Sequence, residues 1–124
     1  MKRAMIGILT VAAVLVGCHK EELKLGQHYK VDGMTVKVRD VADSRCPIGA
    51  DCITEGDATV YLNATDGKES HDFSLDLNGS GNPKDTVFFG YRIRLKDVTP
   101  FPDISDESTM KDNDKKVKLE IIKQ

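Results

Sequence analysis

The chain has 124 residues, of which 40% are hydrophobic and 31% charged, with 18 Lys and Arg against 20 Asp and Glu. This length fits one domain and not two. The slight acidic excess, without any cluster of basic and aromatic residues, argues against nucleic acid as a partner.

The first 17 residues have the pattern of a secretion signal. Lys2 and Arg3 form a positive start, and the run from Met5 to Val16 is mostly apolar. This run is about 12 residues long, shorter than the roughly 17–25 residues of a membrane-spanning helix. We therefore predict that residues 1–17 are a signal peptide and not a permanent anchor.

The end of this run, Leu15-Val16-Gly17-Cys18, resembles the lipobox of bacterial lipoproteins. The resemblance implies that Cys18 becomes the first residue of the mature chain and carries acyl chains such as palmitate, so that a membrane is the expected partner. Each buried methylene contributes about 0.8 kcal/mol, so several chains make a permanent anchor. The alternative is an ordinary secreted protein with a chance cysteine near its cleavage site.

The next residues, His19-Lys20-Glu21-Glu22, resemble a short export signal that directs lipoproteins to the outer face of the bacterial outer membrane. Position 19 is not the aspartate that commonly retains lipoproteins at the inner membrane. The resemblance implies an outer-membrane location with exposure at the cell surface. The alternative is a merely solvated linker, since charged residues keep a linker extended. We expect a lipidated tether over residues 18–26 and a folded domain over residues 27–124.

Cys46 and Cys52 remain once Cys18 is assigned to lipid. An even pair of cysteines in an oxidising compartment predicts a disulfide. The resulting ring of seven residues would stabilise the fold by about 2.4 kcal/mol in the chain-entropy model. Metal binding is the rival for this pair, although Cys-x5-Cys is not the usual spacing of a zinc site.

Apolar and polar residues alternate with a period of two along most of the domain, which is the pattern of half-buried β-strands. Such runs begin at Met34, Ala58, Phe73, Val87 and Val117. Asp32-Gly33 and Asp66-Gly67 predict hairpin turns between runs, and the segment from Asn78 to Pro83 predicts a looser connection. The run from Val87 to Leu95 is unbroken, and a short helical turn is expected between Ile104 and Lys111.

Six to seven strands in about 100 residues, joined by hairpins, predict an all-β fold. We expect an antiparallel β-sandwich of immunoglobulin-like type, with a small barrel as the alternative. The chain has no Trp, which excludes the core of a true antibody domain.

A motif precedes the second of these runs: Asp43-Ser44-Arg45-Cys46-Pro47, a short loop, Cys52 and then Gly56. It is similar to a motif in a family of small bacterial lipoproteins that has no assigned activity. Those proteins often have Trp two positions after the second cysteine, where this chain has Thr54. The stretches 90–93 and 98–102 fit the same resemblance, which covers residues 29–124 and bears on fold more than on activity.

Within this motif, Ser44 has the chemistry of a catalytic nucleophile, which requires a base within hydrogen-bond reach. The histidines are His19, His28 and His71, and nothing in the sequence pairs any of them with Ser44. We therefore expect a structural motif, in which Asp43 and Ser44 stabilise a turn. Arg45 is expected to bind a carboxylate or loop carbonyls.

The segment from Pro100 to Lys116 is a long acidic loop, and its carboxylates are of the kind that Ca²⁺ prefers. They are Asp103, Asp106, Glu107, Asp112 and Asp114. The spacing does not match an EF-hand, because the sixth-position glycine and the late glutamate are missing. We expect a solvated loop without metal, which its length makes a candidate contact surface.

Taken together, these patterns favour a lipid-anchored, non-enzymatic binding or accessory module that contacts an envelope protein or glycan and needs no cofactor. The sequence contains no recognisable triad, phosphate-binding loop or metal cluster. A second hypothesis is a small envelope inhibitor that presents the Cys46–Cys52 loop to an enzyme. A third is an unrecognised hydrolase.

Overall fold

The computed structural model describes residues 18–124, and the predicted signal peptide lies outside the described residues. The described chain forms eight strands and two short 3-10 helices. They are β1 (Cys18–Lys24), β2 (His28–Val31), β3 (Met34–Asp43), β4 (Ala58–Thr65), β5 (Ser70–Asp76), β6 (Asp85–Phe88), β7 (Tyr91–Thr99), η1 (Glu107–Met110), η2 (Asp112–Asp114) and β8 (Lys116–Lys123). Over residues 18–124, no helix is long and apolar enough to cross a membrane.

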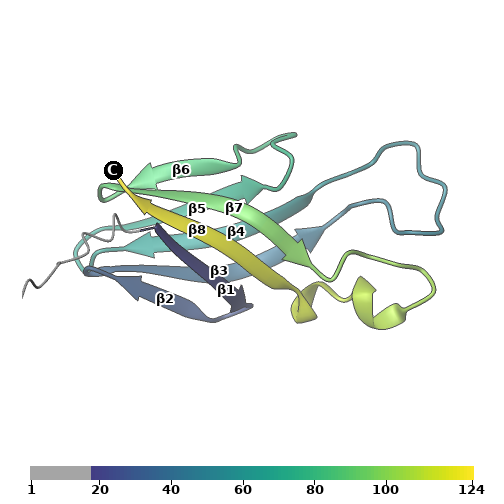
Figure 1. The fold of residues 1–124 in the computed structure, drawn as a ribbon, viewed down its shortest axis with the longest axis horizontal. Helices are drawn as coiled ribbons and strands as arrows, with labels where there is room; N and C mark the ends of the chain where they lie inside the picture. Colours follow the sequence, from purple (N-terminus) through teal and green to yellow (C-terminus); the bar gives the residue numbers. More distant parts are fainter. Residues whose placement is uncertain (1–17) are drawn as a thin grey trace, which may run out of the picture.

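The strands form two antiparallel sheets of four strands each, in the orders β1-β8-β7-β6 and β2-β3-β4-β5 (Figure 1). The predicted antiparallel β-sandwich is confirmed. Neighbours within each sheet are consecutive in the chain, except that the first strand pairs with the last. These connections form a meander, whereas the immunoglobulin domains to which the sequence was likened use Greek-key connections.

The core lies between the two sheets and is built by the alternating runs. The inward positions of β3, β4, β7 and β8 are fully buried, because strand side chains alternate between the two faces of a sheet. The most deeply buried side chains include Val36, Val38, Val60, Leu62, Leu75, Ile93, Val98, Val117 and Ile121. Burial of each such side chain stabilises the fold by about 1.5–3 kcal/mol relative to exposure.

The predicted hairpin turns at Asp32-Gly33 and Asp66-Gly67 are confirmed. The prediction of a single unbroken run from Val87 to Leu95 is wrong, because the chain reverses at Phe89 and Gly90. Their φ angles of +53° and +79° suit the two-residue turn that joins twisted antiparallel strands. Phe88 therefore lies opposite Tyr91, and the run becomes the two strands β6 and β7.

The tether expected over residues 18–26 is wrong for most of its length, because Cys18 is already the first residue of β1. This strand pairs with β8 over seven consecutive positions. Leu23 is buried in the core, and the outward positions alternate with half-buried ones. Polar side chains fit those positions because β1 is an edge strand, half exposed to solvent.

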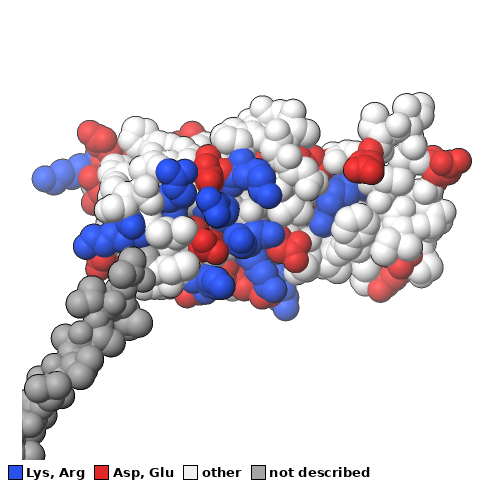
Figure 2. Space-filling model, turned by 45° about the horizontal axis from the view of Figure 1, so that its top comes forward, with Lys and Arg blue, Asp and Glu red and all other residues white. Residues whose placement is uncertain are grey.

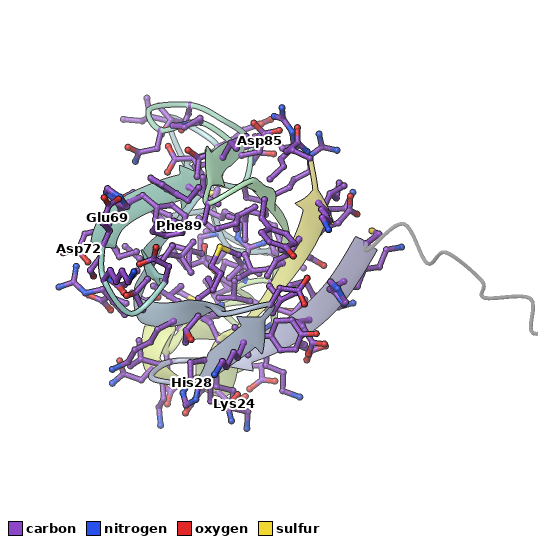
Figure 3. The ribbon with its side chains drawn as sticks, turned by 90° about the vertical axis from the view of Figure 1, so that its left-hand side faces the viewer. Lys24, His28, Glu69, Asp72, Asp85 and Phe89 are labelled. Carbon is purple, nitrogen blue, oxygen red and sulfur yellow. A yellow bond between two sulfur atoms is a disulfide. The ribbon has the colours of Figure 1, made fainter. Side chains whose placement is uncertain are left out.

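Two long connections, residues 44–57 and 100–115, project from one end of the sandwich (Figure 1). The start of β1 and the end of β8 lie at the other end. Figure 3 looks at that other end, where Phe89 marks the β6–β7 turn and Glu69 the β4–β5 turn. The two connections carry the residues that the sequence singled out, so this end of the molecule is the candidate site.

Candidate functional site

Residues 44–57 and 100–115, here called the tip, are joined to each other although they lie far apart in sequence. Ile48 and Asp103 form a parallel β-bridge. The Ile48 amide donates to the Pro102 carbonyl at 2.9 Å, and the Ile104 amide donates to the Ile48 carbonyl at 3.1 Å. The predicted disulfide between Cys46 and Cys52 is confirmed and closes the first loop into a ring. The tip is therefore tied together across both loops.

A buried group of charges lies under the tip and holds both loops. Asp43 accepts two hydrogen bonds from the Arg45 guanidinium, at 2.8 and 2.6 Å, and pairs with the Lys115 ammonium at 3.0 Å. The Arg45 guanidinium also donates to the carbonyl of Val98 at 2.8 Å. The carbonyls of Pro100 and Thr109 accept from Lys115. The carboxylate therefore links the end of β3 to both ends of the 100–115 loop.

This group holds two cations and one carboxylate in a site that solvent barely reaches, since Lys115 is only 1% exposed. Burial of Asp43 by itself raises the pKa of its carboxyl. Hydrogen bonds from Arg45 and Lys115 outweigh that effect and hold the pKa of Asp43 below its ordinary value. The expectation that Arg45 binds a carboxylate and loop carbonyls agrees with these contacts.

Ser44 joins the chain just after β3 to the chain just before β4. Its amide and hydroxyl both donate to the carbonyl of Asp57 at 2.8 Å, and its hydroxyl accepts from the Asp57 amide. The approach is so close that a Cβ at Gly56 would lie 1.9 Å from the Ser44 carbonyl oxygen. Ser44 is thus engaged by backbone, and none of its hydrogen bonds is to a histidine.

A third connection, residues 77–84, is anchored to the base of the tip by two buried carboxylates. Asp57 accepts from the amides of Asn78 and Ser80, and Asp76 accepts from those of Gly81 and Asn82. Burial raises the pKa of the Asp76 carboxyl, but these amides and the Thr59 hydroxyl outweigh that effect. The pKa of Asp76 falls to about 2.

The tip exposes large apolar side chains together with acidic ones. Ile48 and Ile104 are 57% and 54% exposed, and Phe101 and Met110 are 45% and 44% exposed. Ile53 is fully exposed. The same two loops carry exposed acids at Asp51, Glu55, Asp106, Glu107 and Asp114. Lys111 is exposed as well, whereas the tip's other cations, Arg45 and Lys115, are buried.

Beside the disulfide the tip has a shallow hollow of about 270 Å³. It is lined by Arg45, Cys46, Glu55, Gly56, Asn78 and Phe101. The guanidinium carbon of Arg45 lies 4.6 Å from the centre of the Phe101 ring, a cation–π contact that fixes the ring although half of it is exposed. The hollow is open and mixed in polarity, so it suits a side chain of a partner better than an enclosed small molecule.

Two acidic residues of the 100–115 loop, Asp103 and Asp106, stabilise local turns. Asp103 accepts from the amide and hydroxyl of Ser105, and these hydrogen bonds lower the pKa of Asp103. Asp106 caps η1 by accepting from Ser108. Over residues 18–124, no three His, Cys, Asp or Glu side chains gather in a way that could hold a metal ion. The helical turn expected between residues 104 and 111 is present as η1.

Of the residues singled out in the sequence, Asp43, Ser44, Arg45, Pro47, Cys46 and Cys52 come together at the tip or its base. Cys18 is an exposed free cysteine and stands apart from them at the start of β1. Thr54 is exposed. His28 and His71 lie on β2 and β5, away from Ser44.

The burial of Lys115, the close backbone contact at Gly56 and the exposed apolar side chains of the tip were not predicted from the sequence. The burial of Lys115 could have been predicted, because Lys115 lies at the same alternate positions as the inward residues Val117 and Leu119. The apolar side chains also left a signal, because Ile48, Phe101 and Ile104 stand outside every alternating run and yet lie in turn-rich segments. The close approach of Gly56 to the Ser44 backbone could not have been predicted, because it depends on the fold of the loop between them.

Comparison of this chain with protein-family models, with curated proteins and with solved structures found no match.

Proposed function

We propose that the chain is a lipid-anchored, non-enzymatic binding module of the bacterial outer membrane that contacts an envelope protein through its tip. The observation that carries the proposal is the set of exposed apolar side chains on two cross-linked loops. A contiguous exposed apolar surface surrounded by polar residues is typical of an interaction site. Because the two loops are already held in place before a partner binds, less conformational entropy is lost on binding.

The charges of the tip indicate the chemistry of the partner. The two loops that expose Ile48, Phe101 and Ile104 also carry five exposed acids, and their cations Arg45 and Lys115 are buried. A complementary surface would offer an apolar contact with Lys and Arg at its edge, because opposite potentials favour association and set its orientation. An uncharged glycan would not benefit from the exposed acids of the tip, so we favour a protein with a basic rim.

The opposite placement of Cys18 and the tip supports the same function. A lipid on Cys18 lies at the end of the sandwich where β1 starts, and the tip lies at the other end (Figure 1). The anchor and the contact surface therefore do not compete for space.

The lipid anchor can be tested in cells grown with labelled palmitate. The wild-type chain should take up label and partition with the outer membrane, and the Cys18→Ala variant should lose the label. Uptake of label by the Cys18→Ala chain would refute the lipidation site. Protease treatment of intact cells then reports surface exposure, because a surface-exposed tip is cleaved and a periplasmic one is protected.

The tip can be tested with a photo-reactive residue at position 104 in living cells. We expect an adduct of defined mass that is absent when the same probe replaces Val87, an apolar residue of β6 that is 45% exposed. Reversal of charge by Asp106→Lys with Glu107→Lys should remove the adduct, because a basic rim is then repelled. Equal adducts from both probe positions would overturn the assignment of the tip.

A second candidate, an inhibitor of an envelope enzyme, is favoured by one feature of the ring. Ile48 projects from a disulfide-closed loop, and its amide and carbonyl are both held by the neighbouring loop. A preordered apolar side chain of this kind could fill the pocket of an enzyme. Capture of a protease that is lost on Ile48→Ala would favour this candidate over a general binding module.

A further inference from the structure

No flexible linker separates Cys18 from the folded sheet, because Cys18 is the first residue of β1. Its pairing with β8 begins at Cys18 itself, which lies opposite Ile122. A strand rises only about 3.3 Å per residue, so Lys20 lies roughly 7 Å from Cys18 on the same face of the sheet. A lipid on Cys18 therefore brings this face to the level of the lipid headgroups. This step rests on the lipid anchor proposed above.

The face in question is the outer face of the sheet β1-β8-β7-β6, and it is rich in cations although the whole chain has a formal charge of −2. Its cations are Lys20, Lys24, Arg92, Arg94, Lys96, Lys116 and Lys118, and its acids are Glu22, Asp85, Asp97 and Glu120. Figure 2 shows Lys and Arg side chains gathered over the middle of the molecule.

The acids on this face do not neutralise the cations. Arg92 and Arg94 share one carboxylate, that of Asp85, at 3.4 and 3.2 Å. Lys96 pairs with Glu120 at 3.8 Å and Lys116 with Glu22 at 3.7 Å. Lys20, Lys24 and Lys118 form no ion pair with any residue in the range 18–124. The face therefore keeps positive charge for an external anion.

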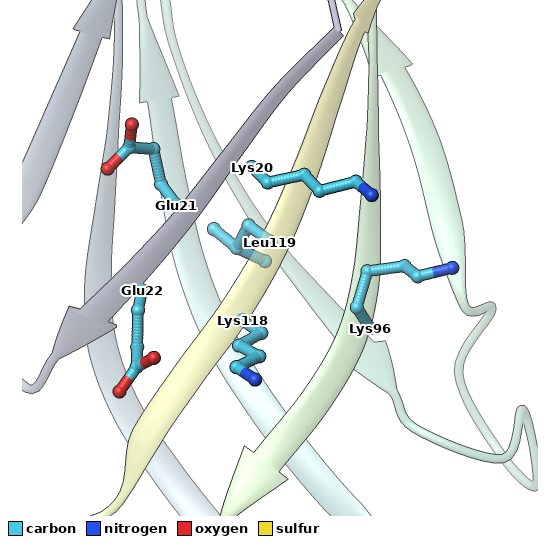
Figure 4. A pocket seen from close by; sticks show the side chains of 6 residues that line it. All are labelled: Lys20, Glu21, Glu22, Lys96, Lys118 and Leu119. Carbon is cyan, nitrogen blue, oxygen red and sulfur yellow. The ribbon is translucent and has the colours of Figure 1, made fainter.

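A groove of about 380 Å³ concentrates three of these cations. It is lined by Lys20, Glu21, Glu22, Lys96, Lys118 and Leu119 (Figure 4). In this view Lys20 extends from β1 across β8, toward the side on which Lys96 lies. Glu21 lies on the far side of β1 from that lysine, and Glu22 is engaged by Lys116 of β8, so the flank of the groove formed by Lys20, Lys96 and Lys118 is basic.

We propose that this outer face rests on anionic lipid headgroups of the membrane that holds Cys18, with the phosphates bound along Lys20, Lys96 and Lys118. Each Lys or Arg near an anionic surface strengthens the association about fivefold. The acidic tip is repelled by the same surface, so the orientation leaves the tip free for a partner.

The mature protein in lipid nanodiscs tests this contact. We compare discs of phosphatidylcholine with discs that also contain phosphatidylglycerol, and follow modification of each lysine by a water-soluble amine reagent. Lys20, Lys96 and Lys118 should react at least about fivefold more slowly in the anionic discs. Lys30, Lys37 and Lys68, which are exposed on the other sheet and its turn, should react equally in both. Salt near 1 M should remove the protection.

Several outcomes would overturn the proposal. Equal reaction of the three lysines in both kinds of disc would refute the contact. Protection by a soluble acidic polysaccharide, without protection by anionic discs, would assign the face to a polysaccharide instead. The intact mass of the protein separates the two proposals: if Cys18 carries no lipid, the anchor fails. The face is then tested by sedimentation of the same protein with phosphatidylglycerol vesicles, where lack of binding refutes it.

A variant series adds a second measurement. Lys20→Gln with Lys96→Gln and Lys118→Gln should abolish the protection of Lys24 and Lys116, which remain on the same face. The matched series Lys30→Gln with Lys37→Gln and Lys68→Gln should retain it. All six lysines are exposed, so neither series is expected to disturb the core. Retained protection in the first series would contradict the role of the groove.

Discussion

Gly56 is the position where a single methyl group would do the most damage to the tip. Its φ is +67°, and an added Cβ would meet the Ser44 carbonyl oxygen at 1.9 Å. Gly56→Ala should lower the free energy of unfolding by more than about 2 kcal/mol, measured by urea denaturation. The control Gly67→Ala shares a positive φ but has open space around it, and should cost about 1 kcal/mol. Equal losses would show that the close approach does not matter.

Asp43 is the only anion in contact with both buried cations beneath the tip, within the part of the chain that the structure describes. Asp43→Asn leaves Arg45 and Lys115 buried without a counter-charge. The free energy of unfolding should therefore fall by about 3–5 kcal/mol. Asp51→Asn, an exposed change in the same tip, should stay within about 0.5 kcal/mol of wild type. A loss from Asp43→Asn as small as that of the control would contradict the role of the charge group.

Asp76 makes the stability depend on pH in a defined range. Its pKa of about 2 in the folded chain lies below the ordinary value of 3.8, so the folded state favours the ionised form. The resulting stabilisation, about 2 kcal/mol, is complete above pH 4 and is lost as the pH falls toward 2. Urea midpoints for wild type and Asp76→Asn should differ at pH 6 and converge near pH 2. A difference that is constant with pH would exclude this carboxylate as the source.

Part of the site could be predicted at the scale of single residues. Arg45 follows Asp43, the last residue of β3, by two positions, so a local ion pair could be predicted from the sequence. Burial of Lys115 could have been predicted, because it shares the parity of the inward residues of β8, but its counter-charge, Asp43, lies far away in the sequence at the end of β3. A contact between residues more than 50 positions apart depends on the strand order, which the alternation of side chains does not specify.

Among the elements, the seven-residue ring is held at two levels, by its disulfide and by the bridge between Ile48 and Asp103. Cys46→Ser with Cys52→Ser should cost about 2.4 kcal/mol. Amide hydrogen exchange should accelerate at Ile48 and Ile104, and the amides of β3 and β4 should remain protected. Exchange that accelerates evenly through the sandwich would show that the disulfide supports the whole fold and not the tip alone.

The elements could be predicted where one face is apolar and the turn residues are distinctive. Runs beginning at Met34, Ala58 and Val117 became strands with the expected buried faces. Phe89-Gly90 escaped notice because an aromatic residue rarely adopts a positive φ. Strand β1 was not predicted because an edge strand buries few of its side chains, so its charged residues resemble those of a linker.

On the scale of the whole molecule, the effect of attaching Cys18 directly to the sheet can be tested by inserting a flexible linker. Ten Gly and Ser residues inserted between Cys18 and His19 give a tether of roughly 18 Å. The domain should keep its stability, and protection of Lys20, Lys96 and Lys118 in anionic discs should weaken, since the local concentration of headgroups falls. Protection that is unaffected by the insertion would mean that the face binds lipid without help from the anchor.

The all-β class and the two-layer sandwich could be predicted from alternation and hairpins alone. The meander could not, because the sequence does not record that the first strand lies beside the last. The joining of the tip loops follows from that arrangement, which brings the end of β3 and the end of β7 to one end of the sandwich.

Pairing of β1 with β8 also orders events during synthesis. Among residues 18–124, β1 pairs with β8 and no other strand, so it has no place in a sheet until the eight residues of β8 have been made. Until then the segment that starts at Cys18 remains unpaired, and its thiol stays open to modifying enzymes. Removal of the whole of β8 would consequently leave β1 without its partner, reduce that sheet to β6 and β7, and expose the core.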